Sequence, residues 1–330
     1  MGSRINRRGI LAGGALAALA APGLSRGAAA QALNRPARIV LGWPPGGAAD
    51  IIARLFAERL RGSYATQVVV ENRPGAAARL GIEAVKAAAP DGATLLVTPE
   101  SMLTIYPHIY PRTLRYDGLR DFVPVSGLCS TSFALAVTPG HPARTLAEFV
   151  AWTRTRPAPA PYASPAAGST PHFLVEELAR ATGMRVEHVA YRGSGPAMPD
   201  LQAGRLAAVI TVTGDMAEYE RTGFGRVIAV SSAERSRRLP EVPTLAEMGH
   251  PALTAEEWYG ILLPAGTPAP LVDALQNAVA EAARDPELLT ALGTMEQRPR
   301  PSTVQEFAAR LRAERERWAP IVQATGFSAE

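Results

Sequence analysis

The chain contains almost no cysteine and almost no lysine. Cys129 is the only cysteine among 330 residues, so an intrachain disulfide cannot form and stability must come from packed cores. Cys129 lies in an apolar run, which predicts a buried structural thiol. The only lysine, Lys86, does not belong to a glycine-rich phosphate loop, which excludes the P-loop class of nucleotide-binding protein.

Signatures of common enzymes and of metal sites are also missing. The chain has neither a Gly-x-Ser-x-Gly elbow nor a complete Gly-x-Gly-x-x-Gly fingerprint. The histidines are scattered singly, so no metal pair at helical spacing exists. They are His108, His141, His172, His188 and His250. We therefore predict no catalytic residue, no metal and no cofactor. An exported hydrolase that uses Ser169 and His172 is the competing enzyme hypothesis, although no orienting carboxylate lies at a suitable spacing.

The first 32 residues have the pattern of a signal peptide. Arg4, Arg7 and Arg8 precede an uncharged stretch rich in alanine, glycine and leucine, and residues 30–32 form the small-x-small pattern of a cleavage site. We predict cleavage after Ala32 and a periplasmic location. The adjacent pair Arg7-Arg8 suits a twin-arginine signal, while the general export route stays open.

Removal of this segment changes the charge balance. It takes away four arginines and no acidic residue, so the formal net charge of +4 falls to zero. A neutral mature chain offers no electrostatic argument for nucleic acid or for an anionic membrane as a partner. At 330 residues, with 47% hydrophobic and 19% charged residues, the chain has the size and composition of two globular domains.

Strands and helices alternate along the first part of the mature chain. Strands are expected at 38–43, 67–70 and 94–98. Apolar residues at helical spacing follow the glycine turn at 44–47, and a second helix is expected at about 80–88. Such alternation is typical of a parallel sheet that is covered by helices.

After an irregular stretch from 99 to 124, the same alternation resumes. Further strands are expected at 133–138, 162–164, 186–190, 207–212, 227–230 and 258–263. Thr145–Glu148 and Ser302–Gln305 match capping boxes at helix starts, and Thr267-Pro268 begins a long amphipathic helix. Thr170 is expected to cap a helix that begins at Pro171 and ends before Gly183.

The segment Trp43-Pro44-Pro45-Gly46-Gly47-Ala48-Ala49-Asp50 is the first candidate binding site. It places two glycines between a buried strand and the first turn of a helix. Free N–H groups at a helix start attract anions, and glycine lets a ligand approach the backbone closely. Asp50 could cap the helix or accept a ligand ammonium or hydroxyl group. A plain turn between strand and helix is the alternative.

Two later segments repeat this arrangement. Residues 163–172 end a strand in small polar residues at a helix start, and residues 191–196 again join a strand, a glycine turn and a helix. Arg192 could hold a carboxylate bidentately, although a structural ion pair is the alternative, and Tyr191 could line a cleft. Two anion-receptive helix starts, one in each half of the chain, would together clamp one carboxylate-bearing ligand.

Seven ordered blocks span nearly the whole mature chain. They are Pro44–Asp50, Val69–Ala76, Pro90–Leu96, Gly168–His172, Tyr191–Ala197, Arg235–Thr244 and Pro264–Pro268. Through these blocks the chain resembles the periplasmic receptors of tripartite tricarboxylate transporters, often called Bug receptors.

The resemblance implies an α/β, type II periplasmic binding fold, with two Rossmann-like lobes, a ligand cleft between them and two chain crossovers. Lobe 1 would comprise residues 33–134 and 257–330, and lobe 2 would comprise residues 135–256. The pattern of the sequence changes near both of these limits. Lobes of such a receptor close around the ligand.

The resemblance also implies that backbone amides and waters hold a carboxylate. The contacts expected in lobe 1 are Trp43, Gly46, Gly47, Ala48, Asp50 and Ser101. The contacts expected in lobe 2 are Ser164, Gly168, Ser169, Thr170, His172, Tyr191, Arg192, Gly193 and Thr211.

One pair of positions departs from the family pattern. Members commonly carry Phe-Asp at the end of a lobe 2 strand, where this chain has Ile210 and Thr211. Loss of that carboxylate removes an acceptor for a ligand ammonium or hydroxyl group, so we do not expect an amino-acid ligand. Asp215 lies near in sequence and could substitute for it.

We therefore expect a monomeric solute receptor that delivers a small organic carboxylate to the membrane permease of a tripartite tricarboxylate-type transporter. A periplasmic sensor that signals to a membrane partner is the alternative within the binding class. The sequence does not name the ligand, because backbone amides bind any carboxylate.

Overall fold

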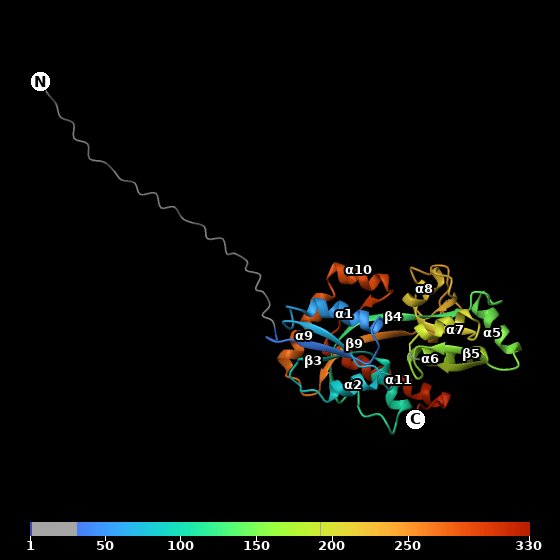
Figure 1. Cartoon of the computed structure of the whole chain (residues 1–330), viewed down its shortest axis with the longest axis horizontal. Helices are drawn as coiled ribbons and strands as arrows, with labels where there is room; N and C mark the ends of the chain where they lie inside the picture. Colours follow the sequence, from blue (N-terminus) through green and yellow to red (C-terminus); the bar gives the residue numbers. More distant parts are fainter. Residues whose placement is uncertain (2–31, 192) are drawn as a thin grey trace. The chain divides into compact units, whose positions relative to one another are not determined.

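A computed structural model of the chain describes Met1, residues 32–191 and residues 193–330. Residues 2–31 of the predicted signal peptide and the predicted contact Arg192 lie outside these described residues. The unit Gln31–Glu330 contains every helix and strand described below (Figure 1).

The first elements form a small parallel sheet with helices on both faces. The strands are β1 (Ala37–Leu41), β2 (Val68–Asn72) and β3 (Thr94–Pro99), and the helices are α1 (Ala48–Leu60) and α2 (Arg79–Lys86). The strands lie in the order β2-β1-β3 and pair in parallel. The predicted alternation of strands and helices is confirmed here, with boundaries shifted by a few residues.

Strand β1 shows how this sheet is buried on both faces. Ile39 packs into one apolar core together with Phe56 of α1, whereas Val40 packs into a second core together with Ile82 of α2. Successive side chains of a strand point to opposite faces. A continuous apolar run is therefore what a strand between two layers of helices requires.

The stretch from 99 to 124 is not irregular as expected. It begins with two four-residue helices, α3 (Ser101–Thr104) and α4 (Tyr106–Ile109), and then enters β4 (Phe122–Val137). Helices this short do not show the apolar period of a longer helix, so the sequence pattern missed them.

Two long strands run between the parallel strand sets. β4 pairs antiparallel with β9 (Glu256–Pro264) along Phe122–Ser132, and the rest of β4 pairs with β7 (Ala208–Val212) and β8 (Arg226–Val230). β9 in turn pairs antiparallel with β3. The sheet is therefore mixed, which corrects the expectation of a parallel sheet. The order β2-β1-β3-β9-β4-β7-β5-β6 places these long strands at its centre (Figure 1).

The second parallel set lies beyond β4. Its remaining elements are α5 (Leu146–Thr155), β5 (Ala160–Ser164), α6 (Thr170–Thr182), β6 (Val186–Ala190), α7 (Met198–Gln202) and α8 (Thr213–Arg221). Two short 3₁₀ turns, Gly195–Ala197 and Pro251–Leu253, complete it. β5 pairs in parallel with both β6 and β7, and two further apolar cores flank this set.

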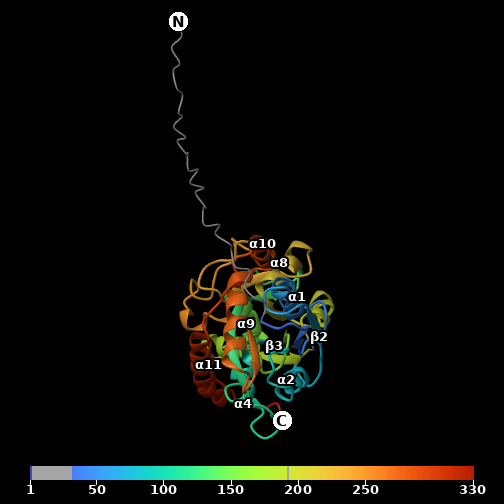
Figure 2. The same cartoon turned by 90° about the vertical axis from the view of Figure 1, so that its left-hand side faces the viewer.

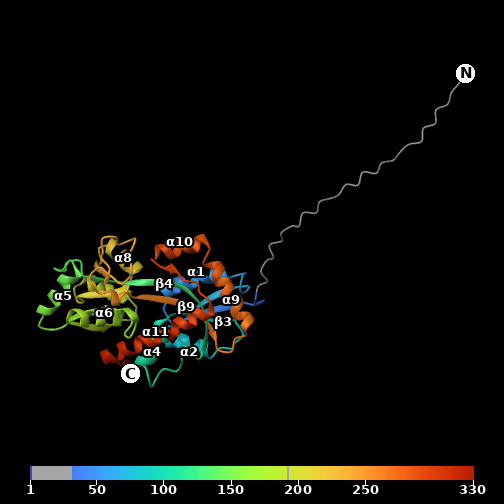
Figure 3. The same cartoon turned by 180° about the vertical axis from the view of Figure 1, so that it is seen from behind.

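The chain then returns to the first set. The last elements are α9 (Ala269–Ala282), α10 (Pro286–Thr294), β10 (Arg298–Pro299) and α11 (Val304–Thr325). Leu275 of α9 joins the core of β1, and Phe307 of α11 joins the core that holds Val40. α9 and α11 are the orange and red helices in Figure 2. α11 also contacts α3, α4 and α6 (Figure 3).

Two predicted helix caps lie one residue away from their true positions. The capping box of α11 is Thr303 with Glu306, because the hydroxyl of Ser302 instead accepts a hydrogen bond from the Gly127 N–H at 2.9 Å. Ser169, not Thr170, is the N-cap residue of α6. The cap of α5 at Thr145 is confirmed, since its side chain accepts from the Glu148 N–H at 3.2 Å.

The loop before α2 contains three consecutive non-glycine residues with positive φ. Gly75 (φ 137°) is followed by Ala76 (φ 47°), Ala77 (φ 54°) and Ala78 (φ 70°). A residue with a Cβ atom loses roughly 1–2 kcal/mol in the left-handed region. The conformation of this loop therefore lowers the free energy of unfolding of the protein.

Replacing Ala77 by glycine should stabilise the protein. The side chain of Ala77 is exposed, so Ala77→Gly relieves left-handed strain without opening a cavity. After the larger chain entropy of glycine is subtracted, we expect a gain of about 0.5–1 kcal/mol in the free energy of unfolding. Urea unfolding measures this change.

Ala87→Gly is the matched control. Ala87 is also exposed but has φ −80°, so glycine there should lower the free energy of unfolding. If both variants lose stability equally, the loop is not strained.

Candidate functional site

A cavity of about 510 Å³ lies where the two parallel strand sets meet the long strands. The segments that follow β1 and β3, the end of β7 and the start of α8 all contribute to its lining, as does β9. In open α/β sheets, ligands bind beyond the carboxyl ends of the parallel strands. The fold therefore brings the ends of both strand sets to one cavity.

Seven of the predicted contacts line this cavity. They are Trp43, Gly46, Gly47, Ala48, Ser101, Gly193 and Thr211. The indole Nε1 of Trp43 and the Oγ of Ser101 are buried and have no hydrogen-bond partner within the described part of the chain. The cavity wall therefore presents polar atoms that a ligand could bind.

The start of α1 leaves backbone N–H groups without a side-chain acceptor. Gly47 is the N-cap residue, and no side chain caps the helix there. Gly46 has φ +88°, and a Cβ atom added at either glycine would meet nothing within 4 Å. The first turn of an α-helix has unpaired N–H groups and a positive dipole end. An anion therefore has both space and donors at this point of the cavity.

Asp50 is fully engaged by the protein. Its carboxylate accepts from the Gly46 N–H at 2.9 Å, from Asn72 at 2.9 Å, and from Arg54 at 2.9 and 3.0 Å. Burial alone would raise the pKa of Asp50, but the hydrogen bonds from Arg54, Gly46 and Asn72 hold the pKa below its usual value. Asp50 does not line the cavity, so its carboxylate fixes the glycine loop, which favours a positioning role over a ligand contact.

The predicted contacts of segment 163–172 do not line the cavity, although Pro165 and Pro171 of the same segment do. Ser164 contacts the Nε2 atom of His188 at 2.8 Å, and its hydroxyl donates to the Ala166 carbonyl at 3.0 Å. The hydroxyl of Ser169 also donates to that carbonyl, at 2.7 Å. These groups shape the turn before α6. Their ligand roles stay predictions that the geometry does not favour.

His172 lies inside an aromatic cluster. Its ring is 4.0 Å from the ring of His188 and 4.8 Å from the ring of Phe327, and its Nδ1 accepts from the Gly168 N–H at 3.0 Å. Burial, together with His188, lowers the pKa of His172 to about 3. The ring is thus neutral near pH 7, and both His172 and Gly168 serve packing.

This geometry gives no support to a hydrolase that uses Ser169 and His172. The Ser169 hydroxyl donates to a carbonyl, and the Nδ1 atom of His172 accepts from a backbone N–H. A triad needs the serine hydroxyl to donate to the imidazole that activates it.

Tyr191, another predicted contact, donates a hydrogen bond to Asp200 and does not line the cavity.

Three acidic residues of the cavity, Asp215, Glu218 and Glu257, are outside the set of predicted contacts, although the sequence indicates Asp215 as a candidate substitute acceptor. Glu257 on β9 is 4% exposed, and Asp215 lies in the first turn of α8. The sequence shows Glu256 and Glu257 side by side in a strand. Strand alternation sends one to each face, but the sequence pattern does not say which face meets the cavity.

Burial shifts the protonation of Glu257. Burial raises its pKa to about 7, although hydrogen bonding lowers it, foremost from the Ser101 N–H that donates to Oε1 at 3.0 Å. Thr170 itself does not line the cavity. Burial likewise raises the pKa of Asp215, whose Oδ2 accepts from the Ser194 hydroxyl at 3.4 Å.

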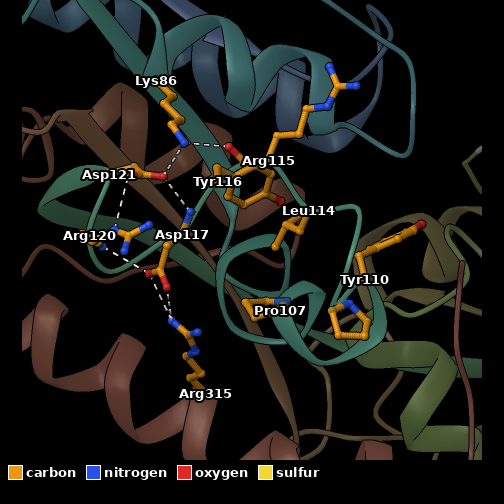
Figure 4. A pocket seen from close by; sticks show the side chains of 11 residues that line it. Lys86, Pro107, Tyr110, Leu114, Arg115, Tyr116, Asp117, Arg120, Asp121 and Arg315 are labelled. Atoms are coloured by element: carbon orange, nitrogen blue, oxygen red, sulfur yellow. Dashed lines mark hydrogen bonds and ion pairs between the residues drawn. The ribbon is translucent and has the colours of Figure 1, made fainter.

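A second pocket, of about 320 Å³, is lined by residues between Lys86 and Asp121 and by Arg315 (Figure 4). Among its described charged residues, all but Arg115 form ion pairs with one another. Lys86 contacts Asp121 at 2.9 Å, and Arg315 of α11 contacts Asp117 at 3.0 Å. Charges that already have partners offer less to a small anion than the open helix start of α1.

Other features of the chain agree with the sequence. Cys129 is buried, as predicted, and burial raises the pKa of its thiol. None of the helices in the described ranges combines the length and the apolar character that a membrane span requires.

The two strand sets, the long strands between them and the shared cavity define a two-lobed α/β binding protein. Comparison with known proteins agrees. The model of the tripartite tricarboxylate transporter family receptor matches residues 52–327. The chain therefore belongs to this family of solute-binding receptors, and both the resemblance and the type II periplasmic binding fold are confirmed.

Individual relatives cover nearly the whole chain. Protein BugT of Bordetella pertussis is 33% identical over 293 residues, which are 88% of this chain and 90% of that protein. A solved structure described as R. palustris Rpa4515 with adipate has a TM-score of 0.83 at 29% identity and covers 89% of this chain and 98% of its own. MatC (Rpa3494) from Rhodopseudomonas palustris with bound malate has a TM-score of 0.80 at 28% identity, with 87% and 99% coverage.

Glu257 should destabilise the fold above neutral pH. A carboxyl group whose pKa rises from 4.5 in the unfolded chain to about 7 in the folded protein costs nothing at pH 4, and its cost grows between pH 4.5 and 7. We expect Glu257→Gln to raise the free energy of unfolding at pH 8 by up to about 3 kcal/mol, with little change at pH 4. Urea unfolding at both pH values measures this.

Glu256→Gln is the control on the same strand. Glu256 pairs with Arg300 at 3.4 Å and does not line the cavity, so its loss should not stabilise the protein. Lower stability of Glu257→Gln than of the unmodified protein at pH 8 would contradict the assignment.

Proposed function

We propose that the mature protein is a periplasmic receptor that captures a small organic carboxylate in the cavity and delivers it to a tripartite tricarboxylate-type permease. Membership of the receptor family supports the first part of this proposal. Structural relatives described with adipate and with malate support a carboxylate as the ligand.

The open start of α1 is the observation that carries the proposal. Gly46 and Gly47 leave free space, no side chain caps the helix, and Asp50 holds the loop from behind. A carboxylate there would receive N–H hydrogen bonds and the field of the helix dipole. Charge-assisted hydrogen bonds of this kind are stronger than neutral ones.

The proposed contacts come from both halves of the chain. The first half contributes Trp43, Gly46, Gly47, Ala48 and Ser101, and the second half contributes Gly193 and Thr211. We assign residues 33–134 and 257–330 to one lobe and residues 135–256 to the other. Capture then means that the two lobes close on the ligand, which shifts the population toward the closed form.

Export and assembly form part of the same proposal. The signal peptide would be removed after Ala32, and the mature receptor would act as a monomer. Co-purification of the protein with permease subunits would support delivery of the ligand to a permease. Co-purification with a membrane signalling protein would favour the sensor alternative.

Gly47→Asp should abolish carboxylate binding and leave the fold intact. The N-cap position has φ −82° and ψ 170°, where aspartate is a favourable cap. Its carboxylate would occupy the N–H groups of α1 and repel a ligand carboxylate. We expect binding to weaken by roughly 100-fold or more, on the scale of one lost charge-assisted hydrogen-bond group of about 3 kcal/mol. Isothermal titration calorimetry with a panel of carboxylates measures the loss.

Gly47→Ser separates charge from capping. Serine also caps the helix but adds no charge, so it should weaken binding less than aspartate does. A Gly47→Asp variant that folds and still binds carboxylates with unchanged affinity would place the anion elsewhere.

A further inference from the structure

Glu257 is a buried acid in a cavity that is proposed to hold an anion. Its side chain is 4% exposed, faces the cavity from β9, and accepts from the N–H of Ser101 at 3.0 Å. Tyr259, two residues further along the same strand, lines the cavity beside it. A carboxyl group at this place disfavours a second ligand carboxylate.

Asp215 lines the same cavity from α8. It lies in the first turn of that helix, is partly buried, and among the described residues it accepts one long hydrogen bond, from the Ser194 hydroxyl at 3.4 Å. Asp215 thus offers the acceptor that the pair Ile210-Thr211 lacks. The two acids stand on the two sides of one cavity.

The described part of the cavity lining has little positive charge with which to balance these acids. Among the lining residues that the structure describes, Arg238 is the only arginine or lysine. It pairs with Glu218 at 3.2 Å and donates to the carbonyl of Thr294 at 3.0 Å. Neither Glu257 nor Asp215 has an ion pair with it.

We propose that Glu257 and Asp215 bind a hydrogen-bond-donating substituent of the ligand, so the receptor selects a carboxylate that carries an ammonium or hydroxyl group over an unsubstituted dicarboxylate. This inference rests on the proposed function, since it assumes that the start of α1 holds one carboxylate. It reverses the expectation that an amino-acid ligand is disfavoured.

The charge balance of the cavity supports this choice. A buried carboxylate is stable when it has an opposite charge or enough donors. A donor-bearing ligand supplies what the protein omits, because its ammonium or hydroxyl group satisfies the acids while its carboxylate satisfies α1. An unsubstituted dicarboxylate would bring a second negative charge with no donor group to offset it, to acids that have no ion pair within the described residues.

The groups behind Glu257 do not supply that cation either. Arg310 of α11 is held by Glu100 through two hydrogen bonds of 2.7 and 2.9 Å. The charge of Glu314, also on α11, raises the pKa of Glu257 further. Burial raises the pKa values of Tyr106 on α4 and Tyr259 on β9, and the nearby charge of Glu257 adds to the rise.

Matched ligands test the selection. Succinate, malate and aspartate differ only in whether one carbon carries hydrogen, hydroxyl or ammonium, and glutarate, 2-hydroxyglutarate and glutamate repeat the series one carbon longer. Calorimetry on the purified protein should show at least tenfold tighter binding of a substituted acid than of the unsubstituted acid of equal length. Equal or tighter binding of the unsubstituted acids at each length that binds would overturn the inference.

Variants assign the selection to the two acids. In Glu257→Gln, ammonium-bearing ligands should bind at least tenfold more weakly while unsubstituted dicarboxylates bind more tightly, and Asp215→Asn should shift affinities in the same directions. A merely structural role would change both ligand types alike. Glu256→Gln, outside the cavity, should retain the selection. Selection that persists in both cavity variants would overturn the inference.

Proton linkage gives a second readout. Near pH 7 a ligand ammonium group favours ionised Glu257, so binding of an ammonium-bearing acid should release a proton, whereas binding of an unsubstituted dicarboxylate should take one up. Calorimetry in buffers of different ionisation enthalpy measures the sign, and Glu257→Gln should reduce the release. Proton uptake on binding of the ammonium-bearing acid would contradict the inference. If no tested carboxylate binds more tightly than 1 mM, the proposed function itself fails.

Discussion

Carboxylate binding by the proposed receptor depends on the N-terminus of α1. Helix geometry leaves N–H groups unpaired there, and the sequence places glycine in front of them. Asp50 makes this arrangement stable. Its carboxylate accepts from the Gly46 N–H, from Arg54 and from Asn72, so the loop is fixed by a side chain that lies behind it. The cavity side of the loop therefore stays open to an external anion.

The long strands β4 and β9 join the two strand sets, and both contribute residues to the cavity that the start of α1 lines. β4 pairs with β9 along its first part and with β7 and β8 along its second part, so one strand serves both halves of the sheet. The same two strands carry the chain between the two halves of the sheet. β9 also brings Glu257 into the cavity. The elements that connect the lobes thereby contribute to what the cavity can recognise.

Local sequence was sufficient where one short segment contains the whole feature. The segment from Trp43 to Asp50 includes both glycines and the start of α1, and its residues 43–49 line the cavity. The same reasoning failed at His172, because its partners His188 and Phe327 are distant in the chain. It also missed Glu257, because tertiary pairing alone decides which face of β9 meets the cavity. Glycine turns alone did not predict which helix starts would be open.

A crystal structure of the protein with a bound carboxylate tests the central claim most directly. The account predicts a carboxylate oxygen within about 2.7–3.2 Å of backbone nitrogens in the first turn of α1, at Ala48 or Ala49, with the rest of the ligand between Glu257 and Asp215. A ligand that binds with its carboxylate away from α1, for instance between Lys86 and Arg315, would contradict it.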